Sequence, residues 1–309
     1  MKYYVGFDIG GTTIKHGVVD ETGKIAVQSA VDTPRDRDQF INLLADVVKQ
    51  YQNLYPIEAI GVCTPGIVQK DGYLLTAGAI RCMYGVNLKH ELEKRTDLVV
   101  SVENDANAAA IAEHWLGAAI GIDNYLCLVI GTGFGGGIII NGQVYRGAHG
   151  MAGEFGWMVT KDYKLTGDIE ESSLNATSAV VGGLCHQYTL AKQQVEPTFE
   201  PIKDARVIFE AAHQGELLAD TILNRFYYDL ATGILDLTAS FDPEVILIGG
   251  GISVNDEFNS NLQAAIQDLE TRHRSIHDVK DVAIAPVKPA KLLNNAGLIG
   301  AVYQIFHKA

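Results

Sequence analysis

Apolar and polar positions along the chain divide it into short strands and longer helices. Runs of strand length open the sequence at Tyr3–Phe7, Thr13–Val19 and Lys24–Val31, with turn residues between them. Later segments with apolar residues at every third or fourth position predict helices. The further predicted strands are Ala59–Cys63, Leu98–Val102 and Val245–Ile248. The predicted helices are Asp38–Tyr51, Asp105–Trp115, 173–190, 204–214, 217–240, 256–274 and Ala296–Phe306.

The opening pattern of strand, glycine turn, strand, polar turn and strand recurs later in the chain. The recurring segments are Tyr125–Ile130, 131–137, Gly137–Ile140, Asn141-Gly142 and Gln143–Arg146. Repetition of such a unit indicates two domains of related build. Both domains mix strands with helices, so the expected fold class is α/β. A small-molecule site is expected in a cleft between two such domains.

Composition and charge narrow the class of protein. Of the 309 residues, 47% are hydrophobic and 20% are charged, which is typical of a soluble globular protein. The net charge is −13 and the basic residues are scattered, so no nucleic-acid partner is expected. The longest apolar stretch, 125–140, is interrupted by glycines and too short to span a bilayer. The four cysteines form no C-x-x-C pair and no signal segment is recognisable, so a cytoplasmic location is expected.

A tight turn with two glycines follows the first strand, in the sequence Asp8-Ile9-Gly10-Gly11-Thr12-Thr13-Ile14-Lys15. Such a turn offers backbone N–H groups and hydroxyls to phosphate oxygens. The carboxylate of Asp8, at the strand end, is suited to Mg²⁺ held through water. An ordinary hairpin turn is the alternative interpretation, and the spacing is not that of a P-loop.

Two further glycine clusters follow buried strands. The segment 131–137 is mostly glycine, which is costly in backbone entropy unless positive φ or close approach is needed. We interpret it as a second phosphate-binding turn, with a structural turn as the alternative. Gly249-Gly250-Gly251 follows the strand Val245–Ile248 and offers a flat surface to an adenine or ribose. A plain strand-to-helix connection is the alternative there.

Polar residues suited to catalysis occur at Glu103-Asn104-Asp105 and in His149–Trp157. A carboxylate at a strand-to-helix junction can accept a proton from an attacking hydroxyl, although helix N-capping is an equally common use of Asn or Asp. The helix N-terminus is expected to lower the basicity of Asp105, which phosphoryl transfer tolerates. Glycines around Glu154 indicate a loop that presents its carboxylate to sugar hydroxyls, whereas His149 and Trp157 also fit plain packing.

In this order and spacing, D-I-G-G-T-x-I-K, E-N-D-A-N, G-T-G-x-G-G-G and G-G-G-I resemble the motifs of the ROK family of bacterial sugar kinases and repressors. The resemblance covers essentially the whole chain. It implies two actin-like ATPase (ribonuclease H-like) domains around an interdomain cleft for ATP, Mg²⁺ and a sugar. We place the domains at 1–117, completed by the C-terminal helix 294–309, and at 118–293. The resemblance also implies a homodimer.

The resemblance gives each motif a role, with Asp105 as the catalytic base. The expected sugar-binding residues are Asn104, Glu154 and Gly66, together with Ser172 and Trp157, which stand at positions where the chain differs from most members. The implied nucleotide-binding residues are Asp8, Gly10, Gly11, Thr12, Lys15, Thr132, Gly133, Gly250 and Gly251, with Asp8 also on Mg²⁺ through water.

The chain departs from the family pattern after Glu154. Most members carry a histidine where Trp157 stands, followed by a cysteine cluster that binds structural zinc, and here Lys161–Ser178 contains no cysteine. A sugar-contacting glutamate after that cluster is replaced by Ser172, although Glu170 and Glu171 are adjacent. We therefore expect no structural zinc and an altered sugar pocket.

Zinc-free members with G-E-F-G and a following aromatic residue include enzymes similar to β-glucoside kinases, and Gly78–Arg81 looks like that subgroup. The expected reaction is ATP-dependent phosphorylation of the 6-hydroxyl of a β-glucoside, with room for the aglycone where the histidine and glutamate are lost. N-acetylmannosamine kinase and glucokinase are the alternatives within this class. A repressor is not expected, because the first strand at Tyr3 leaves no room for a helix-turn-helix before it.

Overall fold

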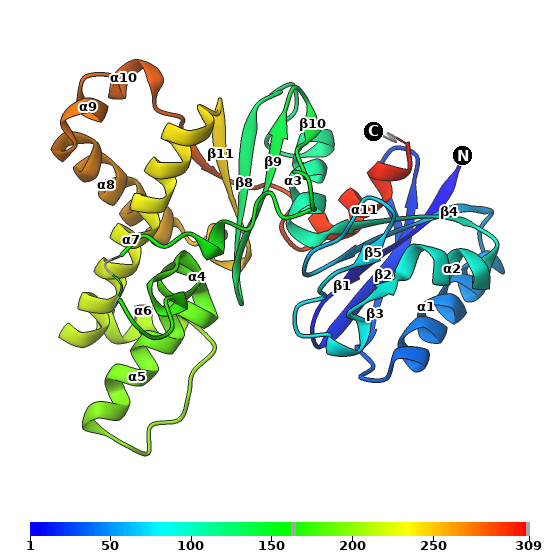
Figure 1. The fold of residues 1–309 in the computed structure, drawn as a ribbon, viewed down its shortest axis with the longest axis horizontal. Coiled ribbons are helices and arrows are strands. Elements are labelled where there is room, and N and C mark those ends of the chain that lie inside the picture. The colour runs from blue at the N-terminus through cyan, green and yellow to red at the C-terminus, as the bar shows by residue number, and fades with distance from the viewer. Residues whose placement is uncertain (162, 164, 307–309) are drawn as a thin grey trace. The chain divides into compact units, whose positions relative to one another are not determined.

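The computed structural model describes residues 1–161, 163 and 165–306, so the end of the predicted segment 294–309 lies outside the described residues. The chain packs into two compact units (Figure 1). Unit 1 consists of Met1–Cys127, Gly137–Gly153 and Lys291–Ala309. Unit 2 consists of Leu128–Gly136 and Glu154–Ala290.

Unit 1 contains a five-stranded sheet with the order β3-β2-β1-β4-β7. Its strands are β1 (Tyr3–Ile9), β2 (Thr13–Asp20), β3 (Ile25–Asp32), β4 (Ile57–Thr64) and β7 (Val99–Asn104). The first three form an antiparallel meander, and β4 and β7 run parallel to β1. The helices of this unit are α1 (Arg37–Gln52), α2 (Leu88–Thr96), α3 (Asp105–Leu116) and α11 (Ala296–Phe306). A small ribbon, β5 (Tyr73–Leu74) with β6 (Val86–Asn87), completes it.

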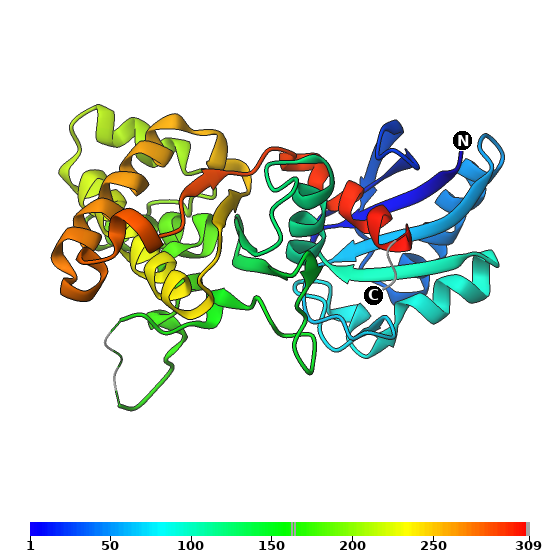
Figure 2. The ribbon, with the colours of Figure 1, turned by 90° about the horizontal axis from the view of Figure 1, so that it is seen from above.

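Side chains alternate across this sheet with the two-residue period of a strand. Val5 and Phe7 belong to the apolar cluster that contains the buried side chains of α1 and α2. Tyr4 packs instead with Leu298 of α11. This helix, red in Figure 2, covers the opposite face of the sheet. Asp8, four residues after Tyr4, therefore lies on the face that α11 covers.

Two glycines allow α11 to approach closely. A Cβ at Gly61 on β4 would lie 2.2 Å from the carbonyl oxygen of Ala301, and a Cβ at Gly300 would lie 1.8 Å from that of Ala108 on α3. Both distances are far below a van der Waals contact, so any side chain at either position would push the helix away. The sheet, α3 and α11 are thus held together by backbone-to-backbone packing.

A buried carboxylate ties the end of α3 to the segment that leads into α11. Glu113 is fully buried and accepts hydrogen bonds from the backbone N–H groups of Ala118 (2.7 Å), Lys291 (3.0 Å) and Leu292 (2.7 Å). Burying a carboxylate is costly unless donors surround it, and here three donors do. Glu113 therefore fixes the path of the chain where it re-enters unit 1.

The second five-stranded sheet has the order β10-β9-β8-β11-β12. Its strands are β8 (Tyr125–Ile130), β9 (Phe134–Ile140), β10 (Gln143–Val144), β11 (Val245–Gly249) and β12 (Val287–Pro289). The helices of unit 2 are α4 (Leu174–Ser178), a π-helix (Val180–Cys185), α5 (His186–Val195), α6 (Arg206–His213), α7 (Leu217–Phe241), α8 (Asp256–Arg272), α9 (Arg274–His277) and α10 (Lys280–Ala283). Phe226 of α7 packs on Phe258 of α8 with ring centroids 6.2 Å apart.

The predicted repeat is visible in the strand orders. Each sheet places three consecutive strands at one edge, followed by two strands from later in the chain. Most predicted helices are confirmed within a few residues. The continuous helix predicted over 173–190 is wrong, because the extended residue Ala179 ends α4 and a π-helix follows. Helix α2 was not predicted, since its sequence is short and mostly polar.

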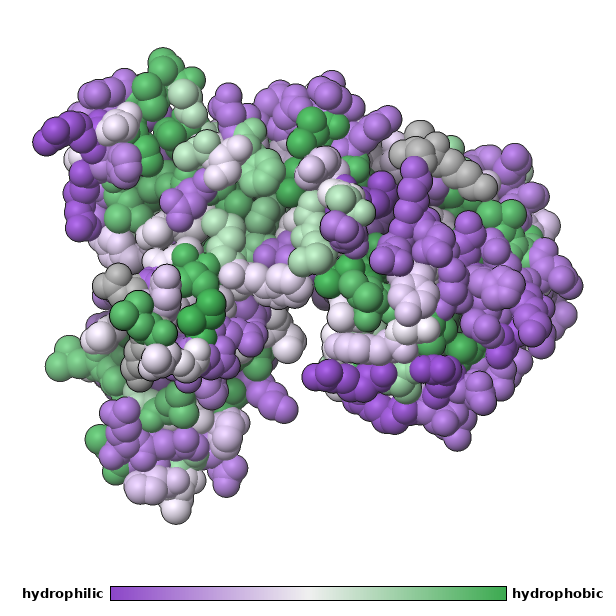
Figure 3. All heavy atoms as spheres, viewed as in Figure 1, coloured by the Kyte–Doolittle hydropathy of each residue, from purple (hydrophilic) through white to green (hydrophobic). Residues whose placement is uncertain are grey.

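The surface agrees with the composition. On the face shown in Figure 3, hydrophilic residues cover most of unit 1. Among the described residues, no helix combines the length and the apolar character needed to cross a bilayer.

Candidate active site

Three neighbouring strands of unit 1 bring chemically active residues to one edge of the sheet. In the parallel register, Asp8 of β1 is opposite Cys63 of β4, and Cys63 is opposite Glu103 of β7. The next residues of β7 and α3 are Asn104 and Asp105. The carboxyl ends of parallel strands are where open α/β sheets place ligands.

Asp105 is the first residue of α3 and is half-buried. Burial and the negative charge of Asp8 raise the pKa of its carboxyl to about 6, against the hydrogen bond from the Ala106 N–H (2.9 Å). The expectation that the helix N-terminus lowers its basicity is therefore wrong. Desolvation and the nearby carboxylate outweigh the helix dipole, and they give a carboxylate that accepts protons near neutral pH.

Asn104 is the N-cap of α3. Its side-chain Oδ1 accepts from the N–H groups of Ala106 (2.9 Å) and Asn107 (3.1 Å), and its Nδ2 donates to the Gly66 carbonyl (2.9 Å). The capping interpretation thus holds for Asn104 and leaves Asp105 available for chemistry. The bond to Gly66, whose φ is +93°, also fixes the loop after β4 beside the start of α3.

Asp8 has two described partners and a close neighbour. Its Oδ2 is 3.6 Å from Lys15 Nζ, and Cys63 Sγ donates to its Oδ1 at 3.4 Å. A Cβ at Gly297 would lie 2.7 Å from Asp8 Cγ, so the carboxylate sits against the first turn of α11. Lys15 Nζ also donates to the Asn294 carbonyl at 3.4 Å, so this residue, predicted to contact phosphate, is engaged with the carboxylate.

The donor set around Asp8 fits Mg²⁺. Burial, together with the charge of Asp8, raises the pKa of both Asp105 and the Cys63 thiol, and two carboxyl groups lie close together here. A hydrated divalent cation would offset that charge, and Mg²⁺ commonly uses only one or two protein carboxylates.

The first glycine turn connects β1 to β2. Gly10 N–H donates to the Thr13 carbonyl at 2.9 Å, and Thr33 holds the turn from the side through its hydroxyl on the Gly10 carbonyl (2.8 Å). Thr12 is exposed at the tip. A Cβ at Gly11 would be 3.3 Å from that of Ala79, so this glycine lies against the loop 78–81.

Glu103 organises the residues behind Asp105. This carboxylate is 3% exposed, and its Oε1 accepts from the Asn104 N–H (2.9 Å) and Asn107 Nδ2 (3.0 Å). Its Oε2 accepts from Arg146 Nε (2.8 Å) and Nη2 (2.7 Å) and from Gln304 Nε2 (3.0 Å). Sequence reasoning missed Arg146 and Gln304, because they are far along the chain and belong to no motif.

In unit 2, the second glycine turn leads from β8 to β9. Gly131 N–H donates to the Gly133 carbonyl (2.9 Å), and Asn175 Oδ1 accepts from the Phe134 N–H (3.0 Å). The Thr132 carbonyl accepts from the N–H of Gly182 (3.1 Å) in the π-helix. The sequence analysis did not propose Asn175 or the Gly182-Gly183 pair, although two adjacent glycines after a helix could have indicated a close backbone approach there.

The third glycine cluster follows β11, which neighbours β8 in the sheet. Gly250 has φ +92°, and a Cβ there would lie 2.1 Å from the Ile130 carbonyl oxygen. Ser253 Oγ donates to the Gly250 carbonyl at 2.8 Å. Next to Gly251 a Cβ would meet no atom within 4 Å, so this face of the turn is open. Both glycine turns of unit 2 therefore leave adjacent strands.

The residues of unit 2 that are predicted to bind sugar lie near a short antiparallel β-bridge. Glu154 precedes a 3₁₀ turn, Phe155–Trp157, and Trp157 is 55% exposed. Val159 bridges to Ser173, and the Ser172 carbonyl accepts from the Thr160 N–H at 3.2 Å. Lys161 Nζ pairs with the buried Asp229 of α7 at 2.5 Å. The backbone pairing and the ion pair thus hold the segment after Glu154 against its neighbours.

Comparison with known proteins identifies the family. The sequence model of the ROK family matches residues 4–308, and the chain belongs to this family. It is 36% identical over 308 residues to a β-glucoside kinase of Listeria innocua, covering 98% of this chain and 97% of that one.

Solved structures agree with this assignment. A ROK family protein from Streptococcus pneumoniae in complex with sucrose is 28% identical with a TM-score of 0.83, covering 99% of each chain. A ROK glucokinase from Streptomyces griseus in complex with glucose and AMPPNP is 31% identical with a TM-score of 0.78, covering 97% of each chain. The fold is that of the actin-like ATPases, as the sequence predicted.

Proposed function

We propose that this chain is an ATP-dependent sugar kinase that phosphorylates the 6-hydroxyl of a β-glucoside, with Asp105 as the general base. The observation that carries the proposal is the carboxyl of Asp105, half-buried at the end of β7 and raised in pKa to about 6. A base with a pKa near the working pH is matched to accepting a hydroxyl proton. Full-length similarity to a β-glucoside kinase supports the substrate class.

In the proposed mechanism, Asn104 and Gly66 orient the sugar so that its 6-hydroxyl points at Asp105. Asp105 accepts the hydroxyl proton as the sugar oxygen bonds to the γ-phosphorus, the bond from that phosphorus to the β–γ bridging oxygen breaks, and ADP leaves. The turn at Gly10, Gly11 and Thr12 offers N–H and hydroxyl donors to phosphate oxygens.

Residues of unit 2 have matching roles in the proposal. Thr132 and Gly133 bind phosphate, Gly250 and Gly251 bind the nucleoside, and Glu154 binds sugar hydroxyls. Asp8 would hold Mg²⁺, which would neutralise phosphate charge when bound. The Lys15 ammonium group, which is paired with Asp8, would then either bind the phosphate or remain near Asp8 and offset its negative charge.

We also propose that the segment after Glu154 keeps its shape without zinc. Among the described residues, no cluster of three or more His, Cys, Asp or Glu side chains could hold a metal ion. The pairing of Val159 with Ser173 and the ion pair of Lys161 with Asp229 are interactions that can hold the segment instead. Trp157, more than half exposed, offers an aromatic face to an aglycone.

Substrate choice tests the β-glucoside assignment. In a coupled ADP-release assay, we expect kcat/KM to be highest for cellobiose or gentiobiose among a panel with glucose, N-acetylmannosamine, N-acetylglucosamine and fructose. Burial of the Trp157 face against the second sugar ring should contribute about 1 kcal/mol, so the preference over glucose should be several-fold. Turnover of one monosaccharide and of no disaccharide would instead identify a glucokinase or an N-acetylmannosamine kinase. Absence of turnover with every sugar of the panel would refute the kinase assignment.

Acidification should reduce turnover through Asp105. Only the carboxylate can accept the proton, and its pKa is raised to about 6. With saturating ATP and sugar, kcat should therefore be level above pH 7 and fall about tenfold per pH unit once the pH is below that pKa. Mg²⁺ beside Asp8 would lower the pH at the midpoint of this profile, because a nearby cation favours the ionised form of Asp105. A midpoint above pH 7, or a rate that rises as the pH falls, contradicts the assignment.

A further inference from the structure

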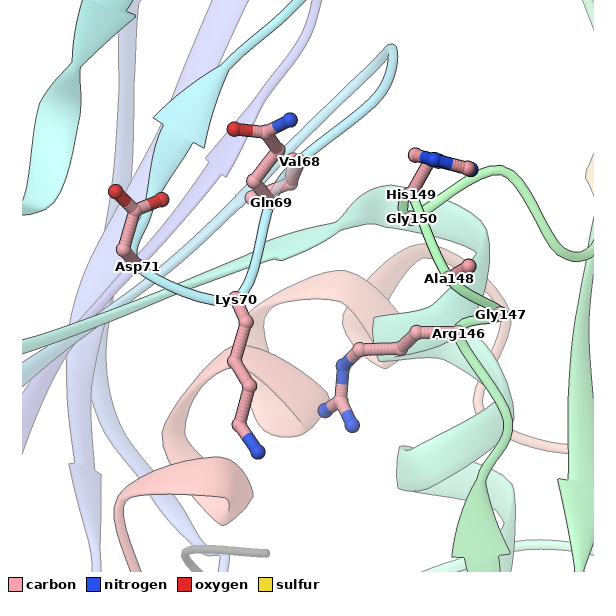
Figure 4. Close-up of a pocket in the computed structure, with 9 residues that line it drawn as sticks. All are labelled: Val68, Gln69, Lys70, Asp71, Arg146, Gly147, Ala148, His149 and Gly150. Atoms are coloured by element: carbon pink, nitrogen blue, oxygen red, sulfur yellow. The ribbon is translucent and has the colours of Figure 1, made fainter.

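A cavity of about 480 Å³ lies in unit 1, on loops that the proposed reaction does not use (Figure 4). It is lined by Val68, Gln69, Lys70, Asp71, Arg146, Gly147, Ala148, His149 and Gly150. A second, smaller cavity shares Val68, Gln69, Lys70 and Arg146 and extends past Lys89 to the outer edge of β7. We refer to the two together as the Arg146 cavity.

Arg146 is held in place by the network described above and still has donors to spare. The buried Glu103 takes its Nε and one N–H of Nη2. A guanidinium has five N–H groups, so three remain without a partner among the described residues. A side chain that is already oriented loses little conformational entropy when it binds a ligand.

Lys70 approaches the same space from the opposite wall. In Figure 4 its ammonium group and the Arg146 guanidinium point into the cavity together, whereas the Asp71 carboxylate points away. Asp71 is engaged in its own turn, accepting from the Tyr73 N–H at 3.1 Å and from Asn87 Nδ2 at 3.3 Å. Within the described chain, neither Lys70 nor Lys89 has an ion pair or a side-chain hydrogen bond.

The charges of the lining are therefore unbalanced where a ligand would sit. Glu103 is the other acidic group of the lining, and it is buried and saturated with donors. Three cationic groups thus face a cavity in a chain whose net charge is −13. Arg146 is paired with Glu103, whereas Lys70 and Lys89 add positive charge without an ion pair among the described residues, and a bound anion would neutralise it.

We propose that the Arg146 cavity is a second anion site, which binds a phosphate dianion through Arg146, Lys70 and Lys89. The dianion is either free phosphate or the phosphate group of a small metabolite such as a sugar phosphate; the cavity volume accommodates both. The lining shares no residue with the glycine turn at Gly10–Thr12. This site is independent of the proposed kinase reaction, and its test does not need turnover.

Isothermal titration of the full-length, nucleotide-free chain at fixed ionic strength tests the site. Inorganic phosphate, glucose 6-phosphate and unphosphorylated glucose are the probes. The variant Lys70→Gln/Lys89→Gln removes two cations from the lining. The variant Lys49→Gln/Lys94→Gln removes two exposed cations from α1 and α2 and matches its net charge. Arg146 is left unchanged because replacing it would leave the buried Glu103 carboxylate without its ion-pair partner.

We expect saturable binding of a phosphate-bearing probe, weakened about tenfold or more in Lys70→Gln/Lys89→Gln and within about twofold of wild type in the control variant. For the binding that Lys70→Gln/Lys89→Gln weakens, a higher affinity for glucose 6-phosphate than for phosphate would identify a phosphorylated metabolite, and equal affinity would identify free phosphate. The proposal is overturned if both variants weaken binding equally, if neither does, or if wild type shows no saturable binding. Turnover of both variants should match that of wild type. Titration therefore tests the anion site and turnover tests the kinase assignment, so failure of one proposal can be told from failure of the other.

Discussion

Asp105→Asn should lower kcat by about 10²–10⁴-fold, which is the usual worth of general-base assistance. Asparagine has nearly the same shape and keeps an oxygen for the Ala106 N–H, but it cannot take up the hydroxyl proton. Nucleotide affinity should stay within a few-fold of wild type, because the glycine turns are untouched. The measurements are steady-state kinetics and nucleotide titration on the same preparation.

Stability separates loss of the base from misfolding. The folded pKa of Asp105 lies above the unfolded value of 3.8, so its favourable contribution is complete below pH 3.8 and is lost as the pH rises through about 6. At pH 7.5 the neutral asparagine escapes this penalty, and the variant should be at least as stable as wild type. Asp46→Asn, at an exposed position of α1, is the matched control and should change neither rate nor stability. Near-normal turnover of Asp105→Asn contradicts the assignment of the base.

Glu103→Ala should lower the free energy of unfolding by about 2–4 kcal/mol, because the partly exposed Arg146 loses its partner and the donors of Asn104 and Asn107 lose their acceptor. The carboxylate is 3% exposed and takes two hydrogen bonds from Arg146. It also accepts from the Asn104 N–H, next to the proposed base, so kcat should fall as well. Urea unfolding gives the stability, and the same preparation gives the rate.

A second variant shows whether the pair itself is responsible. In Glu103→Leu/Arg146→Met both charges are replaced by apolar groups, and part of the lost stability should return because no unpaired charge remains. Turnover should stay low in the double variant, since the Asn104 N–H still lacks its acceptor. Equal destabilisation in the single and double variants would show that shape, rather than charge, explains the effect. Glu21→Ala, on the surface, serves as the control.

The sequence was sufficient for the features that depend on neighbouring residues. The strand, turn and strand pattern at Tyr3–Val19 and the helix after Asn104 follow from local apolar periodicity and capping, and both are confirmed. The glycine turns also occur where glycine is required, as Gly250 with φ +92° illustrates. Such features need no knowledge of distant contacts.

Features that join distant parts of the chain were not predictable in this way. The pairing of Glu103 with Arg146 spans 43 residues, and the bonds from Lys291 and Leu292 to Glu113 span nearly 180. The pKa of Asp105 rises because the carboxyl is buried and because Asp8, on another strand, lies near it. Neither residue type nor local spacing signals these contacts, since they depend on how the strands are ordered in the sheet.

The position of the transferred phosphate tests the central proposal most directly. Wild-type protein is incubated with ATP, Mg²⁺ and cellobiose, and the product is examined by phosphorus–proton correlation NMR. The proposal predicts a phosphorus signal coupled to the C6 protons of a glucose unit and one ADP formed per phosphate transferred. A phosphate on an anomeric or secondary oxygen, or release of inorganic phosphate without a phosphorylated sugar, would contradict it.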